Sequence, residues 1–140
     1  MTFKESLLEY LPESEADSLI ASIEEGKVTH ALLLNTKKMS DEEFLSRFPN
    51  VKKHPFVEHA YLYDKSEYEF GKSMLYEDGV FSIEDPAAMM PVYFLHPEED
   101  DVILDMCAAP GGKSIGASLA MNDKGCIISN DISYPRAKAM

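Results

Sequence analysis

The residues best suited to chemistry in this sequence form a glycine-rich run between an apolar segment and a helical one. Residues 105–114 read D-M-C-A-A-P-G-G-K-S, and residues 102–104 before them (V-I-L) are typical of a strand buried on both faces. Glycines permit a tight turn and let a ligand approach the backbone closely. The N–H groups at the start of the helix predicted over residues 113–121 can hold an anionic group. The run therefore predicts a site for a nucleotide-like ligand.

An acidic residue follows the next predicted strand. Residues 126–129 (C-I-I-S) form that strand, and Asn130 and Asp131 come directly after it. Asp131 lies 20 residues after Gly111, a spacing at which an acid can accept hydrogen bonds from ribose hydroxyls. The order strand, glycine loop, helix, strand and acid predicts the opening unit of a Rossmann-like parallel sheet.

Two phosphate-binding motifs fit the run only in part. The motif G-x-x-x-x-G-K-[ST] matches at Gly112, Lys113 and Ser114, but Cys107 holds the position of its first glycine. The motif G-x-G-x-x-G, started at Gly111, fails because its third position is Lys113. A protein that binds a nucleoside triphosphate through Lys113 is therefore an alternative that the motif does not favour.

The run resembles the cofactor loop of a known enzyme family. Residues 105–114 closely resemble that of the Sun/nucleolar-protein family of S-adenosylmethionine-dependent RNA 5-methylcytosine methyltransferases. Residues 130–133 (N-D-I-S), followed by Arg136, resemble the family's next element. Upstream, residues 31–36 and residues 83–89 (I-E-D-P-A-A-M) are similar to its small N-terminal domain. The resemblance covers most of the chain.

The resemblance implies a binding site for S-adenosylmethionine. The backbone from Cys107 to Lys113 would line the methionine and ribose end of the cofactor, and Asp131 would hold the ribose hydroxyls. Asp105 would lie beneath the loop near the methionine part, and Arg136 would shape the adenosine side. The expected cofactor-binding residues are Asp105, Cys107, Ala108, Ala109, Pro110, Gly111, Gly112, Lys113, Asp131 and Arg136.

The resemblance also implies chemistry that these residues do not supply. In the family a cysteine thiolate attacks C6 of cytosine, which makes C5 nucleophilic toward the sulfonium methyl group. That cysteine and a second one lie on later strands, in D-A-P-C-S-G and T-C-S motifs that do not occur here. Cys107 would belong to the loop, and Cys126 is expected to be a small buried strand residue. We therefore expect a fragment with no catalytic residue, no methyl transfer by the chain alone, and cofactor binding that is weakened or absent.

The remaining elements predict an α/β fold class. The order of elements indicates a small α+β N-terminal domain over residues 1–84, then the incomplete first βαβ unit of a Rossmann-like methyltransferase sheet over residues 85–140. An incomplete sheet with open strand edges can also self-associate. The elements expected in the first domain are two short amphipathic helices packing on it, a strand at 31–35, a helix at 41–48 capped by Ser40 and Glu43, a strand at 56–63, a hairpin at 74–83 turning at Asp78 and Gly79, and a helix starting at Asp85 and Pro86.

Composition excludes several classes of protein. The first residues lack a signal-peptide pattern, and the longest apolar stretch, residues 87–95, is too short to span a membrane. Two cysteines make neither a disulfide framework nor a metal-ligand spacing, and the four histidines show none either, so a reduced, cytoplasmic protein without a metal is expected.

The charge of the chain is unusual for a protein expected to bind RNA. The net charge is -12, and residues 1–101 carry 9 Lys and Arg against 22 Asp and Glu. On the family resemblance, RNA is the expected partner, with ribosomal RNA favoured over transfer RNA and a single-stranded or loop target. A non-catalytic adaptor that binds RNA or protein remains the alternative. A local basic strip is formed by Lys37, Lys38, Arg47, Lys52, Lys53 and His54.

Overall fold

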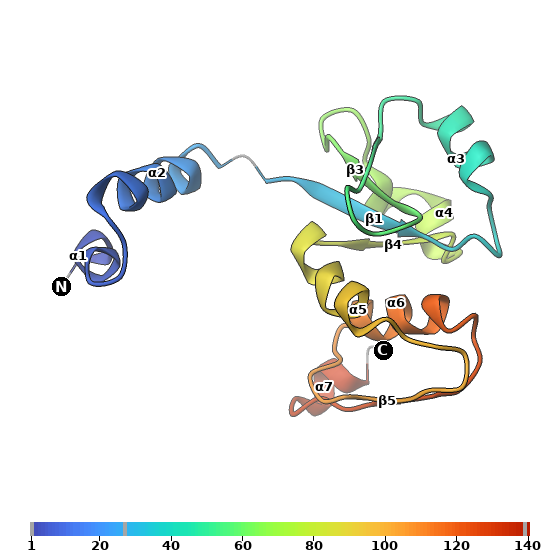
Figure 1. Ribbon diagram of the computed structural model, residues 1–140. Helices are drawn as coiled ribbons and strands as arrows, with labels where there is room; N and C mark the ends of the chain where they lie inside the picture. Colours follow the sequence, from blue (N-terminus) through green and yellow to red (C-terminus); the bar gives the residue numbers. More distant parts are fainter. Residues whose placement is uncertain (1, 27, 139) are drawn as a thin grey trace.

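The chain folds into a pair of N-terminal helices followed by two β-sheets (Figure 1). The structure, a computed structural model, describes residues 2–26, 28–138 and 140. A four-stranded sheet has the order β2-β3-β1-β4, and a two-stranded sheet pairs β5 with β6. The elements are α1 (Phe3–Leu8), α2 (Glu13–Glu24), β1 (His30–Leu34), α3 (Asp41–Arg47), β2 (Lys52–Lys53), β3 (Ala60–Tyr63), η1 (Phe70–Lys72), α4 (Met74–Glu77), β4 (Phe81–Glu84), η2 (Pro86–Met89), α5 (Met90–Leu95), β5 (Val102–Asp105), α6 (Gly112–Ala120), β6 (Cys126–Ser129) and α7 (Tyr134–Ala137).

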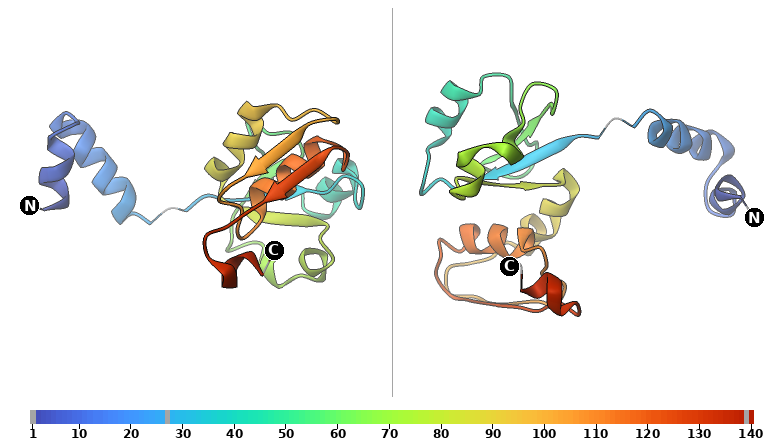
Figure 2. Two further views of the ribbon diagram at one scale, coloured as in Figure 1. Left: turned by 90° about the horizontal axis from the view of Figure 1, so that it is seen from below. Right: turned by 180° about the vertical axis from the view of Figure 1, so that it is seen from behind.

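The two N-terminal helices form where the apolar spacing predicts them. Thr2 accepts a hydrogen bond from the backbone of Glu5, and Glu5 accepts one in return, which completes a capping box at α1. The helices pack on each other, and Figures 1 and 2 show them standing apart from both sheets. The prediction that they pack on the small domain is therefore wrong. Ala16 is the one buried residue of α2, so the contact covers only a small part of the apolar surface of the pair.

The central strand β1 carries the core of the four-stranded sheet. It pairs antiparallel with β3 and β4, so that Leu32 lies opposite Tyr61 on one side and Ile83 on the other. Alternate side chains of β1 serve two clusters. Leu32 and Leu34 pack beneath α3, and Ala31 and Leu33 pack in a second cluster that Leu119 of α6 joins. Both faces of β1 are therefore covered, which is why its sequence is apolar without alternation.

Two local predictions in this sheet are wrong. Residues 74–83 form no hairpin, because Met74–Glu77 is the short helix α4, capped by the Ser73 hydroxyl that accepts from the backbone of Tyr76. Asp78 is in the right-handed helical region and only Gly79 has a positive φ, whereas a two-residue hairpin turn of this type needs both. The strand predicted over residues 56–63 is shorter and comprises Ala60–Tyr63.

The second sheet confirms the predicted strand–loop–helix–strand unit. β5 and β6 run parallel with Val102 opposite Cys126 and Asp105 opposite Ser129, and α6 connects them. One face is left open, since Val102 is 72% exposed and Cys126 is exposed. The predictions that these strands are buried on both faces, and that Cys126 is buried, are therefore wrong, because α6 covers one face alone. The domain division after residue 84 stays a prediction. Across that boundary, α6 of the second unit packs against β4 of the first.

Candidate cofactor-binding site

The glycine-rich run forms the loop that leads from β5 into α6. Gly111 precedes the helix with φ +116°, a backbone conformation that side chains disfavour, so glycine is required at this position. Its N–H donates to the Ala108 carbonyl at 2.7 Å and closes a tight turn. The loop therefore returns on itself just before the helix begins.

Asp105 ties the two ends of the loop together from below. One carboxylate oxygen accepts the Cys107 N–H at 3.2 Å, and the other accepts the Ser114 hydroxyl at 2.9 Å. The Ser114 hydroxyl is in turn 2.8 Å from that of Ser129 on β6. The structure thus places Asp105 beneath the loop, with its carboxylate bonded to the protein itself.

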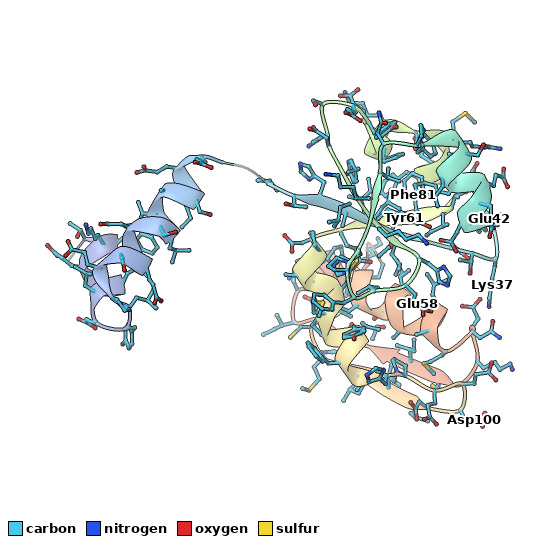
Figure 3. All side chains as sticks on the ribbon, turned by 45° about the horizontal axis from the view of Figure 1, so that its top comes forward. Lys37, Glu42, Glu58, Tyr61, Phe81 and Asp100 are labelled. Atoms are coloured by element: carbon cyan, nitrogen blue, oxygen red, sulfur yellow. The ribbon has the colours of Figure 1, made fainter. Side chains whose placement is uncertain are left out.

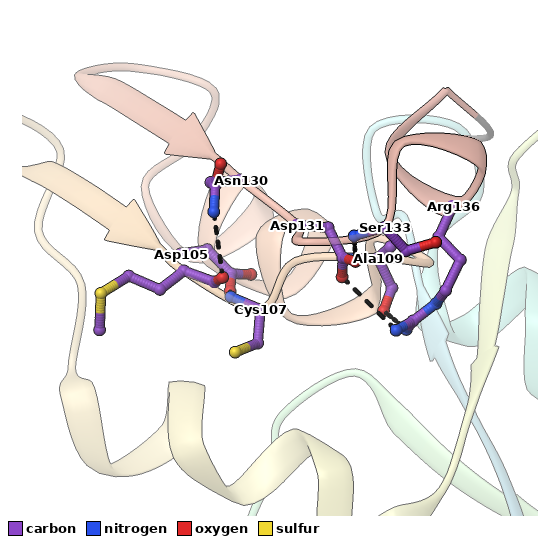
Figure 4. Close-up of polar contacts among 8 residues, drawn as sticks. Asp105, Cys107, Ala109, Asn130, Asp131, Ser133 and Arg136 are labelled. Atoms are coloured by element: carbon purple, nitrogen blue, oxygen red, sulfur yellow. Dashed lines mark hydrogen bonds and ion pairs between the residues drawn. The ribbon is translucent and has the colours of Figure 1, made fainter.

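Asp131 fixes the middle of the loop to the end of β6 (Figure 4). Its carboxylate accepts the Ala109 N–H at 3.2 Å and the Ser133 N–H at 2.9 Å. Arg136 lies 3.6 Å from the same carboxylate and also donates to the Ala109 carbonyl. The Asp131 side chain is 3% exposed, and it faces the loop. Each carboxylate oxygen has a second lone pair with which it can accept a hydroxyl group. The role of Asp131 toward the ribose stays a prediction.

Asn130 is a further residue that shapes the loop and that sequence reasoning did not single out. Its carbonyl accepts the Ala108 N–H at 2.9 Å, its N–H donates to the Asp105 carbonyl at 2.8 Å, and its side-chain amide donates to the Met106 carbonyl at 3.4 Å (Figure 4). Its place directly after a predicted strand was the available signal. The backbone N–H groups of Cys107, Ala108, Ala109 and Gly111 are accordingly all engaged within the protein.

The first turn of α6 provides the donors that are free. Within the part of the chain that the structure describes, the N–H groups of Gly112, Lys113 and Ser114 have no hydrogen-bond partner. The first N–H groups of an α-helix lack an acceptor inside the helix, and the helix dipole favours an anion there. This end of α6 is therefore suited to a carboxylate or another small anion.

A cavity of about 620 Å³ opens beside the loop, between β4 and the start of α6. Ala108, Pro110 and Lys113 line it from the loop side, and Ser82 and Glu84 line it from β4. The loop therefore borders a space in which a small molecule can contact the loop, α6 and the edge strand β4 together.

Neither a metal centre nor a membrane span is found among residues 2–26, 28–138 and 140. No group of three or more His, Cys, Asp or Glu side chains there could hold a metal ion. No helix in those segments is long and apolar enough to cross a membrane.

Substitution of Asp131 by asparagine is expected to loosen the loop. The asparagine amide group would face a backbone N–H of Ala109 or Ser133, so one buried donor would lose its acceptor, at a cost of about 1–3 kcal/mol. Faster amide hydrogen exchange at Ala109 would report the effect. Asp100→Asn, at an exposed carboxylate before β5 (Figure 3), is the matched control. Equal exchange rates in the two variants would contradict the role given to Asp131.

Known proteins are similar to this chain in sequence and in fold. Residues 92–140 match the profile of the family described as 16S rRNA methyltransferase RsmB/F. The chain is 30% identical over 149 positions to a ribosomal RNA small subunit methyltransferase F from Photobacterium profundum, in an alignment covering 99% of the chain and 31% of that protein. It is 32% identical to a tRNA (cytosine(49)-C(5))-methyltransferase from Pyrococcus abyssi, over 77% of the chain and 33% of that protein. The chain thus spans about a third of the length of these relatives.

Solved structures share the fold at lower sequence identity. The structure of NSun6 from Pyrococcus horikoshii superposes with a TM-score of 0.85 at 17% identity, covering 98% of the chain and 60% of that protein. A methyltransferase homolog from the same organism superposes with a TM-score of 0.75 at 22% identity, covering 94% and 48%. These likenesses confirm the fold class, and the sequence relatives confirm the family predicted from the loop: the chain belongs to the RsmB/F methyltransferase family.

Proposed function

We propose that this chain forms the S-adenosylmethionine-binding portion of an enzyme that methylates C5 of cytosine in RNA, with ribosomal RNA as the substrate. One observation carries the proposal. The loop at residues 105–114 passes from a parallel strand into α6, leaves three N–H groups of the helix free, and is held by Asp131 from the next strand. This is the arrangement in which a Rossmann-like unit receives a nucleoside-containing ligand.

The donors present fit the chemistry of S-adenosylmethionine. The N–H groups of Gly112, Lys113 and Ser114 would hold its carboxylate, and the free lone pairs of Asp131 would accept its ribose hydroxyls. The backbone of residues 107–111 would line the cofactor by its shape, since its N–H groups are already engaged. Asp105 and Arg136 would hold the loop and the Ala109 carbonyl in place. When bound, the cofactor supplies an electrophilic methyl group.

RNA as the substrate is supported by the names of the relatives and by part of the surface. The relative from Photobacterium profundum, aligned over 99% of the chain, is named for ribosomal RNA, and the relative from Pyrococcus abyssi, aligned over 77%, is named for transfer RNA. The longer alignment favours ribosomal RNA. The basic strip is partly neutralised, because Lys37 pairs with Asp123 and Arg47 pairs with Glu43, each at 2.6 Å. Lys38 donates to the Asp78 carbonyl, so Lys52 and Lys53 on β2 are the cations of the strip that have no ion pair or side-chain hydrogen bond among the described residues. We expect them to contact phosphates.

The proposal includes the cytoplasm as the compartment and the catalytic cysteine on a segment outside these 140 residues. Both stay predictions. Cys107 is exposed, but we do not propose it as the catalytic cysteine. It lies in the loop, where its N–H donates to Asp105, and we assign it to cofactor binding.

Titration with S-adenosylhomocysteine, followed by amide chemical shifts, tests the proposal. We expect weak binding, because the chain spans about a third of its relatives, with the largest shifts at Gly112, Lys113 and Ser114. Adenosine triphosphate is the control ligand, and Lys113→Ala is the control variant. Tight triphosphate binding that requires Lys113 would replace this proposal with the nucleotide-binding alternative. Salt-dependent RNA binding with no response to S-adenosylhomocysteine would instead favour the adaptor alternative.

A further inference from the structure

Glu84, the last residue of β4, lies directly against the first residue of α6. A Cβ atom added to Gly112 would stand 2.8 Å from Cδ of Glu84, and 2.9 Å and 3.1 Å from its two carboxyl oxygens. A carbon side chain at position 112 and the Glu84 carboxyl therefore need the same space. The absence of a side chain at Gly112 is what allows the Glu84 carboxyl to lie against the start of α6.

The Glu84 carboxyl is also enclosed from other sides. It is partly buried, and the Ser82 hydroxyl donates to one of its oxygens at 3.0 Å. The cavity of about 620 Å³ and a second one of about 790 Å³ meet at this point, since both Glu84 and Gly112 line each of them. The other titratable groups that line the two cavities are Glu58, His59, Tyr76, Glu77, Asp85, Tyr93, His96, Glu98 and Lys113.

The surroundings of Glu84 favour its uncharged form. Burial raises the pKa of the Glu84 carboxyl above its ordinary value of 4.5, because a buried carboxylate loses contact with water. The hydrogen bond from Ser82 and the positive charge of Lys113 act in the opposite direction and are weaker. The carboxyl that touches Gly112 thus stays protonated to a higher pH than an exposed glutamate does.

We propose that Glu84 is a positioning residue for the first turn of α6, and that its neutral carboxyl is the form that seats Gly112 for ligand binding. The carboxyl lies against Gly112, the first of the three residues whose N–H groups would hold the anion. An ionised Glu84 places a negative charge at the helix end that would receive an anion, and like charges there repel. This inference rests on the proposed function in one respect, namely that the anion is the cofactor's carboxylate.

A double-mutant cycle tests the contact itself. Gly112→Ala is expected to lower the melting temperature of the chain, because the new Cβ collides with the Glu84 carboxyl, and this partly buried group can move aside only by losing its hydrogen bond from Ser82. In a Glu84→Ala background the collision disappears, and the same Gly112→Ala change should raise the melting temperature, since alanine favours a helix over glycine. A reversal of sign supports the proposal. An equal loss in both backgrounds overturns it.

The pH dependence of stability tests the charge state, and Glu84→Gln keeps the shape of the side chain without the charge. The pKa of Glu84 is raised in the folded state. Its contribution to the stability of the fold is therefore complete below pH 4.5 and is lost as the pH rises through the folded-state pKa. The melting temperature of the wild-type chain should therefore fall below that of Glu84→Gln as the pH is raised. Glu77→Gln, at an exposed glutamate lining the same cavity, should follow the wild type. Parallel wild-type and Glu84→Gln profiles overturn the proposal.

Binding of S-adenosylhomocysteine, measured between pH 5 and pH 8, connects the contact to function. We expect the wild-type dissociation constant to rise with pH severalfold more than that of Glu84→Gln. Equal rises in the two proteins overturn the link between Glu84 and the anion. If neither protein binds at any pH, the proposed function fails for this chain, while the mutant cycle and the melting profiles still decide the role of Glu84.

Discussion

Substitution of Phe44 by alanine is expected to remove about 3–5 kcal/mol from the free energy of unfolding of the four-stranded sheet. Phe44 belongs to α3, and its side chain is fully buried against the four-stranded sheet. Its ring lies 4.9 Å from that of Tyr61 and 6.0 Å from that of Phe70, measured between ring centroids. Figure 3 labels Tyr61 on β3 and Phe81 on β4, the two strands that flank β1. The Phe81 ring lies 6.2 Å from that of Phe44 in an edge-on contact. Alanine would leave a cavity at the meeting point of these rings.

Urea unfolding followed by circular dichroism measures the Phe44→Ala effect, and hydrogen exchange at β1 locates it. A loss of this size is a large share of the total stability of about 5–15 kcal/mol usual for a domain. Phe56→Ala is the matched control, because Phe56 is 58% exposed and its truncation leaves no enclosed cavity. A loss at Phe44 no greater than that at Phe56 would show that α3 does not cover the sheet as described.

The second large effect is expected at Gly125, which joins α6 to β6. Its φ is +69°, and a Cβ there would collide with the Asp101 carbonyl and the end of Met121, and would stand 2.9 Å from the Glu99 carbonyl. Backbone atoms cannot move aside as a flexible side chain can. We expect Gly125→Ala to cost about 2–5 kcal/mol, combining the positive φ with overpacking. The Cys126 N–H donates to the Asp101 carbonyl at 2.9 Å, so the first pairing of the parallel sheet would be lost.

Gly79→Ala separates the two causes. Gly79 also has a positive φ, +65°, but its nearest neighbour would be the mobile end of Lys38 at 3.3 Å. Only the backbone strain, about 1–2 kcal/mol, should remain there. Thermal unfolding of both variants gives the comparison, and equal losses would mean that the carbonyls of Glu99 and Asp101 do not crowd Gly125.

The balance of charge in the molecule bears on the proposed binding of RNA. The chain has a net charge of -12, and several lysines form ion pairs with acidic residues of the chain itself, as Lys124 does with Glu99 at 2.6 Å. A Lys52 and Lys53 pair on one short strand gives a small cationic surface. Binding of RNA through it alone should therefore be weak and sensitive to salt.

The sequence by itself determined the elements that depend on local signals. The run at 102–131 predicted strand, loop, helix and strand, because its glycines, apolar residues and final acid follow one another at fixed spacing. Ser40 and Asp85 predicted two helix starts, since a cap acts through the N–H groups two or three residues away. The family resemblance followed mainly from the loop, because a long and specific motif is unlikely to arise by chance, and residues 130–133 and 83–89 supported it.

Other features were decided only by the tertiary structure. The side chains of Asp105 and Asp131 bond to the loop, and whether a carboxylate faces a ligand or its own backbone depends on residues that come together in space. The prediction of a hairpin at 74–83 was wrong because β4 pairs with β1, some 50 residues earlier in the chain, and not with the residues just before it. The exposure of Cys126 depends on what covers the sheet, and the contact of Glu84 with Gly112 depends on how α6 packs against β4. Such contacts join distant parts of the chain, and no local pattern encodes them.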